Sequence, residues 1–145
     1  MEETSTELAL ALLPHGPEFR FVDRLLELER GKKGVGEYEV KPAAEFLRGH
    51  FPGHPIMPGV LMIEALAQVA GTVAQSDPSI TPLADLRLTA VRGAKILGTA
   101  SPGQRLRIEV EIIARLGSLI QARGTVAVGG HKIVEAELVL SGQAP

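Results

Sequence analysis

One segment, GHFPGHPIMPGVLMIEALAQ over residues 49–68, combines side chains that can exchange protons with a rigid backbone. His50 stands in a loop rich in proline and glycine, and Glu64 is the single carboxylate of the apolar run that follows. An imidazole can take up and return a proton near neutral pH. A carboxylic acid in apolar surroundings stays protonated to higher pH and can donate that proton. We therefore take His50 as a candidate base and Glu64 as a candidate acid.

The start of the apolar run adds a third kind of group. Proline is favoured in the first turn of a helix, so Pro58 predicts that a helix begins there. The backbone N–H groups of Gly59, Val60 and Leu61 would then be free and would carry the positive end of the helix dipole. Such groups can hold a carbonyl oxygen that gains negative charge. The loop that positions them would include Phe51, Pro52, Gly53 and Pro58. Base, acid and oxyanion donors together describe proton removal beside a carbonyl with loss of a β-substituent.

Each candidate also has a simpler interpretation. Glu64 falls on a narrow polar stripe with Gln68, Gly71 and Gln75, where it could merely be solvated. His50 could be a loop histidine whose nitrogens are satisfied by its neighbours. The other histidines are interpreted as structural or exposed: His15, His54 and His131.

A metal site and serine chemistry fit the segment less well. Zinc could be bound by His50, His54 and Glu64, but the prolines and glycine between them exclude the helix that would bring the two histidines to one face. The chain has no cysteine for a metal site or a thiolate nucleophile. It also lacks the G-x-S-x-G elbow of serine acyl transfer. We therefore expect no metal.

The rest of the chain predicts the elements that must position these groups. A short helix is expected over 5–14, ending at Pro14. Turns are expected around Gly31 and at the glycine pair 129–130. Strands are predicted over 19–29, 34–40, 86–97, 106–114, 118–128 and 131–141, an irregular segment over 42–57 and a helix over 58–75.

The periodicity of these elements predicts the fold class. In 106–114 the apolar residues alternate with charged ones, so that Leu106, Ile108, Val110 and Ile112 face one way. Strands of this kind form a sheet with one dry face, and a helix as apolar as 58–75 is normally buried. We expect an α+β architecture: a curved antiparallel β-sheet wrapped around one long central helix, as a single domain over 1–145.

Composition excludes several classes of protein. The 145 residues are 45% hydrophobic and 22% charged, which is typical of a globular chain. A net charge of −2 without a Lys/Arg block argues against nucleic-acid binding. The apolar patch LALALL is too short to span a membrane, and acidic residues precede it, unlike in a signal peptide. We expect a cytoplasmic protein without membrane contact.

The segment 49–68 resembles the signature of the FabZ-type 3-hydroxyacyl-[acyl-carrier-protein] dehydratases. LLPHGPEFRFVDRLLELERGKKG, SPGQRLRIEVEI and HKIVEAEL are similar to further parts of that family, so that the resemblance covers most of residues 12–140. It implies the hot-dog fold. By position, His50 matches the family's catalytic histidine, Glu64 its catalytic glutamate and Gly59 the glycine whose amide polarises the thioester carbonyl. Glutamate at 64, where FabA-like relatives have aspartate, favours the branch that only dehydrates.

The resemblance also implies a mechanism and an assembly. His50 would remove the α-proton of a (3R)-hydroxyacyl thioester, and Glu64 would protonate the departing hydroxyl, which leaves a trans-2-enoyl thioester. No metal or organic cofactor would be needed. The acyl group would be carried by acyl carrier protein or coenzyme A. The working unit would be a homodimer in which each site takes His50 from one subunit and Glu64 from the other, further assembled as a trimer of dimers.

The chain departs from the family outside the acid–base pair. Gly16 replaces the arginine after LPH, and GAKILGTASPGQ lacks an arginine pair, a proline and the aspartate, whose place Gln104 takes. No aromatic residue occurs in ITPLADLRLTAV, where relatives place residues that gate the acyl tunnel. These differences bear on carrier contacts, accepted chain length and the hexamer. Candidate cations for docking an acidic carrier are Arg92, Lys95, Arg105 and Arg107.

Two other classes of function remain open. A hot-dog thioesterase would use Glu64 to activate water and would not need His50. A non-catalytic subunit would bind acyl thioesters within a larger complex and turn nothing over by itself. The products separate them, because hydrolysis releases free thiol.

Overall fold

In the computed structural model, the described residues are 9–10, 13–44, 47, 53 and 55–144, and every structural statement below concerns these residues. Six strands form one antiparallel sheet in the order β1-β2-β4-β5-β6-β3. The elements are a 3-10 helix η1 (Pro17–Phe19), β1 (Arg24–Glu29), β2 (Lys33–Glu39), α2 (Gly59–Gln75), β3 (Ala84–Ile96), β4 (Arg105–Leu116), β5 (Leu119–Val128) and β6 (His131–Gln143).

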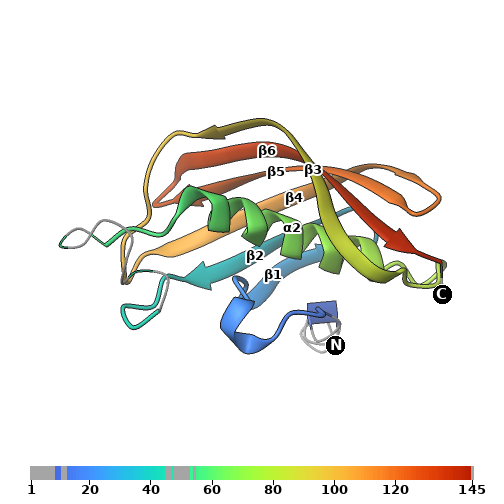
Figure 1. The fold of residues 1–145 in the computed structure, drawn as a ribbon, viewed down its shortest axis with the longest axis horizontal. Coiled ribbons are helices and arrows are strands. Elements are labelled where there is room, and N and C mark those ends of the chain that lie inside the picture. The colour runs from blue at the N-terminus through green and yellow to red at the C-terminus, as the bar shows by residue number, and fades with distance from the viewer. Residues whose placement is uncertain (1–8, 11–12, 45–46, 48–52, 54, 145) are drawn as a thin grey trace.

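The sheet curves around one helix. In Figure 1, α2 lies lengthwise against the strands, with β3 at one edge and the N-terminal segment beside β1 near the other. Every residue of α2 from Met62 to Ala74 except Glu64 is buried, as expected for a helix that is apolar on nearly all sides. The expected arrangement of a curved antiparallel sheet around one long helix is confirmed.

Most predicted boundaries agree with the structure. The helix predicted over 58–75 is α2, although Pro58 is its N-cap, with an extended backbone, and not a residue of its first turn. The last four predicted strands correspond to β3 through β6. The glycine pair 129–130 has positive φ at both positions, 57° and 82°, which is the requirement of a two-residue type I′ hairpin.

The strand predicted over 19–29 is wrong at its beginning. Residues 17–19 form η1, and β1 begins only at Arg24. The reason is a side chain of the central helix: the Phe21 N–H donates to Oε1 of Gln68 and the Phe19 carbonyl accepts from its Nε2, both at 2.8 Å. This backbone is therefore bound to α2. The helix predicted over 5–14 falls partly outside the described residues; 9–10 are helical and 13–14 are not.

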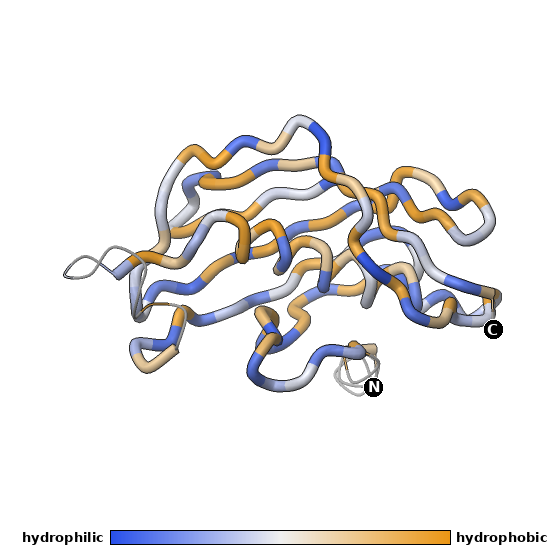
Figure 2. Tube along the Cα trace, in the orientation of Figure 1, coloured by the Kyte–Doolittle hydropathy of each residue, from blue (hydrophilic) through white to orange (hydrophobic). Residues whose placement is uncertain are grey.

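The core lies between α2 and the inward face of the sheet. In β4, Leu106 and Ile108 are fully buried, while Arg107 and Glu109 between and after them are exposed. This alternation of hydrophobic and hydrophilic positions can be followed along the strands in Figure 2. The prediction that the apolar residues of 106–114 share the dry face is confirmed.

Gly124 in β5 is tightly packed between the neighbouring strand and the helix. A Cβ atom at this position would lie 2.5 Å from the Glu109 carbonyl oxygen and 2.9 Å from Cδ2 of Leu66 in α2. Because a backbone carbonyl cannot move aside cheaply, we expect Gly124→Ala to lower the free energy of unfolding by about 2–3 kcal/mol. Chemical denaturation measures this.

A matched control for this change is available in α2. At Gly71 an added Cβ would meet Leu86 Cδ2 at 3.4 Å, an ordinary contact. Gly71→Ala should therefore raise stability by up to about 1 kcal/mol through helix propensity. Equal stabilities of the two alanine variants would contradict the packing argument.

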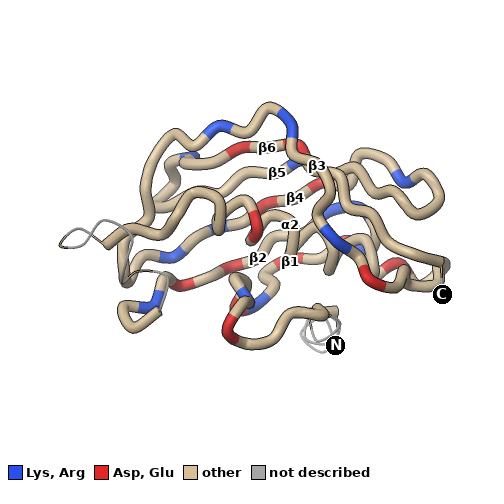
Figure 3. The backbone as a smooth tube through the Cα atoms, viewed as in Figure 1, with Lys and Arg blue, Asp and Glu red and all other residues tan. Residues whose placement is uncertain are grey.

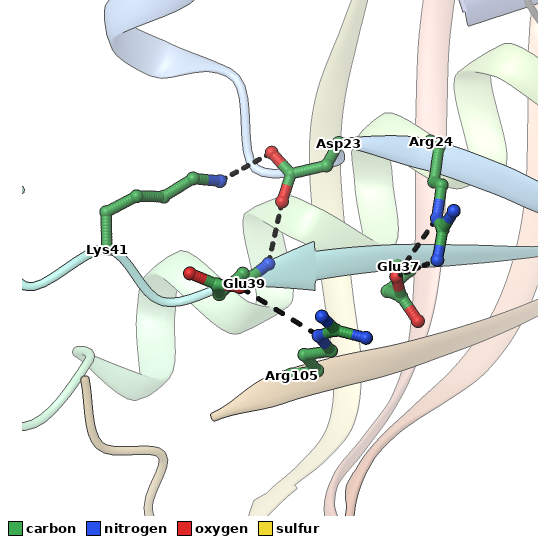
Figure 4. Close-up of polar contacts among 6 residues, drawn as sticks. All are labelled: Asp23, Arg24, Glu37, Glu39, Lys41 and Arg105. Carbon is green, nitrogen blue, oxygen red and sulfur yellow. Dashed lines mark hydrogen bonds and ion pairs between the residues drawn. The ribbon is translucent and has the colours of Figure 1, made fainter. Parts of the chain in front are cut away.

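The outward face of the sheet is covered by ion pairs. Both basic and acidic positions lie along the strands in Figure 3, whereas α2 carries one acidic residue, Glu64, and no basic one. Figure 4 shows the pairs at the β1–β2–β4 side, where Arg24 donates to Glu37 at 2.8 Å and Lys41 reaches Asp23. Exposed pairs of this kind contribute up to about 1 kcal/mol each, so the fold depends on the apolar face.

Tyr38, the only tyrosine of the chain, is buried at the end of β2. Burial in the first place, and the nearby Asp23 charge in the second, raise the pKa of its hydroxyl from 10.0 to about 12. The folded state thus favours the neutral phenol, and the stability it contributes should be lost as the pH rises from 10 towards 12. Tyrosinate absorbance of the native protein should have its midpoint near 12, with Tyr38→Phe as the silent control. A midpoint near 10 in folded protein would contradict it.

Two further expectations concern membrane-spanning helices and the extent of the domain. Among the described residues, no helix has both the length and the apolar character needed to cross a membrane. The extent of the domain, 1–145, stays a prediction, because residues 1–8 and 145 lie outside the described part.

Candidate active site

Glu64 projects from the second turn of α2 towards the N-terminal segment. Its side chain is 20% exposed, and one oxygen, Oε2, makes both of its polar contacts. Gln68, one turn further along the helix, donates to Oε2 from Nε2 at 3.1 Å. Nε2 of His15 lies 3.3 Å from the same oxygen. The carboxyl group is therefore held, not freely solvated, and the polar-stripe interpretation of Glu64 does not describe its surroundings.

Gln68 is the buried clamp of this site. Its side chain is 1% exposed, and its amide binds Phe19, Phe21 and Glu64 at once. The helix and the N-terminal segment are thereby tied together at the point where the acid stands. Gln75, two turns on, binds the Leu83 backbone N–H and carbonyl in the same manner. The polar stripe of α2 thus consists of side chains that fasten loops to the helix.

A row of rings supports His15. The imidazole is stacked on Phe19 with centroids 6.0 Å apart, Phe19 meets Phe21 edge-on at 4.9 Å, and Phe21 meets Tyr38 at 5.9 Å. Three of the five aromatic residues of the chain therefore lie in this row. Such contacts fix ring orientation, so His15 is held beside Glu64 from its other side.

Glu64 lies in the wall of a partly apolar cavity of about 380 Å³ between α2, the N-terminal segment and β3. A volume of this size is at the lower end of what small-molecule sites have. A larger hollow of about 2,100 Å³ is lined largely by charged strand residues, and Glu64 is not among them. The apolar wall of the smaller cavity is formed by Leu13, Ala67, Leu83, Leu86, Leu88 and Leu140, and its polar lining by His15, Glu64, Gln68, Thr72, Gln75, Asp85 and Arg87.

The first turn of α2 offers two of the three predicted N–H donors. The N–H groups of Gly59 and Val60 have no partner among the described residues, but the prediction is wrong for Leu61, because the Pro58 carbonyl accepts from Leu61 at 3.0 Å and from Met62 at 3.4 Å. Gly59 lies against the Ile96 side chain, where a Cβ atom would come within 2.4 Å of Ile96 Cδ1. Only glycine allows β3 to approach the helix end this closely.

Several predicted site residues lie outside the described residues. His50, Phe51 and Pro52 are among these, as is His54, so neither the candidate base nor the zinc alternative can be placed. Gly53 is exposed and has φ of +91°, which suits glycine. Within the described ranges, no cluster of three or more His, Asp or Glu side chains could bind a metal ion.

Sequence reasoning missed two residues of the site. His15, predicted to be structural or exposed, lies against Glu64, and its place in the LPH segment is the signal that points to it. Gln68, predicted only as part of a polar stripe, contacts the acid, and its spacing of four from Glu64 on a helix otherwise apolar there is the signal.

Comparisons with known proteins agree with this geometry. A family model described as a FabA-like domain matches residues 13–137. The chain is 40% identical over 132 residues to the 3-hydroxyacyl-[acyl-carrier-protein] dehydratase FabZ of Geobacillus thermodenitrificans, covering 90% of each chain. It is 43% identical over 131 residues to the FabZ of Geotalea uraniireducens, covering 89% of this chain and 90% of that one. A solved structure, the dehydratase heterocomplex ApeI:P of Xenorhabdus doucetiae, is similar with a TM-score of 0.77 at 18% identity, covering 91% and 88%; this likeness confirms the hot-dog fold.

Proposed function

Because this chain belongs to the FabA-like domain family, and resembles its FabZ dehydratases over nine tenths of its length, we propose that it dehydrates 3-hydroxyacyl thioesters of a carrier protein. The observation that carries the proposal is Glu64: the only charged residue of α2, held by two neighbours at the wall of a partly apolar cavity. An acid so placed can protonate a leaving group on an acyl chain lying in that cavity.

The reaction needs one proton removed and one supplied. His50 takes the proton from C2 of the (3R)-hydroxyacyl thioester, and the released electron pair forms the C2–C3 double bond. The C3–O bond breaks, and Glu64 gives its proton to the departing hydroxyl, which leaves as water. The trans-2-enoyl thioester remains, and the proton on His50 and the charge on Glu64 are exchanged with solvent before the next turnover. The role of His50 rests on its position in the sequence.

The thioester carbonyl gains negative charge when C2 loses its proton. The N–H groups of Gly59 and Val60 are suited to this oxygen, because they are free among the described residues and stand at the positive end of α2. This role agrees with the close packing of Gly59 on Ile96, which fixes the helix end against β3.

The directions of these groups favour a site shared by two copies. Gly59 and Glu64 are five positions apart, so their Cα–Cβ directions differ by about 140° around the helix axis. Gly59 faces Ile96 of β3, and Glu64 faces the N-terminal segment. β3 is an edge strand, and three apolar residues on it or directly after it are exposed: Val91, Ile96 and Leu97. The unpaired edge of a sheet is suited to pairing with a second copy. We therefore include a homodimer in the proposal; a trimer of dimers and a cytoplasmic location stay predictions.

Docking of an acidic carrier would use cations that are not already neutralised. Of the four candidates, Lys95 lies 3.6 Å from Glu135, Arg105 3.9 Å from Glu39 and Arg107 3.2 Å from Glu27. Arg92 is exposed, and within the described part of the chain no carboxylate pairs with it. Arg92→Glu is therefore the charge reversal that should weaken turnover of a carrier-linked substrate most, with Arg107→Glu for comparison.

The test is a dehydration assay with 3-hydroxybutyryl and 3-hydroxydecanoyl thioesters that follows enoyl absorbance and released thiol together. Enoyl product without thiol, lost in His50→Ala, supports the proposal. Thiol without enoyl product would overturn it in favour of a hot-dog thioesterase. Folded protein that binds the thioesters but releases neither product would indicate a non-catalytic subunit.

A further inference from the structure

His15 is the one histidine among the described residues that lies in the cavity wall, and the mechanism above gives it no role. Its Nε2 is 3.3 Å from Oε2 of Glu64, and its ring is stacked on Phe19. The distance is slightly long for a hydrogen bond, but contacts of catalytic groups are often long in the empty site and shorten when substrate binds. The contact is therefore suited to positioning the acid.

The other ring nitrogen indicates which nitrogen carries the proton. Nδ1 of His15 is buried and has no hydrogen-bond partner among the described residues. A proton there would be a buried donor without an acceptor, which costs more than leaving a nitrogen lone pair unused beside apolar neighbours. The geometry thus places a proton at Nε2, which lies 3.3 Å from Oε2 of Glu64.

An Nε2–H donor at this place gives the two carboxyl oxygens of Glu64 different roles. Gln68 and His15 both approach Oε2, and no described residue is in polar contact with Oε1. A protonated carboxyl group accepts at its carbonyl oxygen and donates from its hydroxyl oxygen. With Oε2 accepting twice, the acidic proton resides on Oε1. The other charged groups of the cavity wall are Asp85 and Arg87, and no ion pair joins either of them to His15 or Glu64 within the described residues.

We propose that His15 is a positioning residue for Glu64: its Nε2–H holds Oε2, so that Oε1 presents its proton to the substrate hydroxyl. This inference rests on the proposed dehydratase function for its kinetic consequence. Its structural content, the Nε2–H tautomer, does not depend on activity.

Two matched substitutions of His15 show which ring nitrogen makes the contact. The amide nitrogen of glutamine can occupy the place of Nε2, whereas that of asparagine falls near Nδ1. His15→Gln should keep kcat within about threefold of wild type, while His15→Asn and His15→Leu should lose about 10- to 100-fold in kcat with little change in KM. Losses that are equal in all three variants, or absent from all three, would overturn the positioning role.

The tautomer is read directly from long-range ¹H–¹⁵N spectra of histidine-labelled protein, with His15→Gln to assign the signal. A proton on Nε2 is expected. A ring protonated at Nδ1 alone would overturn the inference even in an active enzyme. If wild type forms no enoyl product, the proposed function fails, and the spectra still decide the placement of the proton.

Discussion

Glu64→Gln should lower kcat for dehydration by about 10³-fold, because general acid catalysis contributes about 10²- to 10⁴-fold and an amide cannot supply the proton. The substitution is nearly isosteric. Its carbonyl oxygen can take the place of Oε2 and accept from Gln68, 3.1 Å away in wild type. The cavity and the fold should therefore remain, and KM for the thioester should stay within about threefold. Parallel measurement of enoyl product and thermal unfolding checks both statements.

A surface glutamate provides the control. Glu109 on β4 is exposed and pairs with Arg107 at 2.9 Å, far from the cavity wall. Glu109→Gln removes the same charge and should retain wild-type turnover. A loss of less than tenfold in Glu64→Gln would show that another group protonates the hydroxyl. A thioesterase would also need Glu64 to activate water. The activity of His50→Ala and the amount of thiol released therefore decide which reaction was lost.

The parts of this fold that follow from local pattern could be predicted from the sequence. The helix over 59–75 is recognisable because proline precedes it and its length is apolar, and the β5–β6 hairpin because two glycines supply the positive φ that its turn requires. The candidate acid could be found for the same reason: it is the one charge in an apolar helix. These features depend on residues close together in the chain.

The parts that depend on distant contacts could not be predicted in this way. The stretch that follows η1 alternates like a strand, yet its backbone is bound by Gln68, which is 47 residues away from Phe21 in the sequence. The role of His15 could not be predicted for a similar reason: it is far from Glu64 in the sequence, and the two are in contact only when the N-terminal segment lies along α2. The spacing of polar residues along a helix does not show that their side chains will bind the backbone of a distant loop.

Gln68→Leu should lower the free energy of unfolding by about 2–5 kcal/mol, and chemical denaturation measures it. Leucine has a similar volume, but it takes away the acceptor of the Phe21 N–H and the donor to the Phe19 carbonyl in a site that is 1% exposed. Each lost partner of a buried backbone group costs about 1–3 kcal/mol. Dehydration should fall as well, because Glu64 loses its 3.1 Å contact.

Gln75→Leu is the matched control. Gln75 stands on the same helix and makes the same pair of backbone contacts, to Leu83 at 2.8 Å and 3.0 Å, but it is only partly buried. Water can replace the lost groups there, so the cost should be about 0.5–1.5 kcal/mol. Equal losses in the free energy of unfolding for the two variants would mean that burial does not determine how much these glutamine contacts stabilise the fold.

Gln68→Glu tests the direction of the hydrogen bonds. The introduced carboxylate can still accept from the Phe21 N–H, but it cannot donate to the Phe19 carbonyl or to Glu64, and it brings a second negative charge beside the first. Folding should therefore favour its protonated form, which restores one donor. The pKa of the introduced carboxyl group would be higher in the folded than in the unfolded state, so this variant should gain stability relative to wild type as the pH falls and lose it as the pH rises. A stability difference from wild type that does not change between acidic and neutral pH would show that the amide of Gln68 is not a required donor.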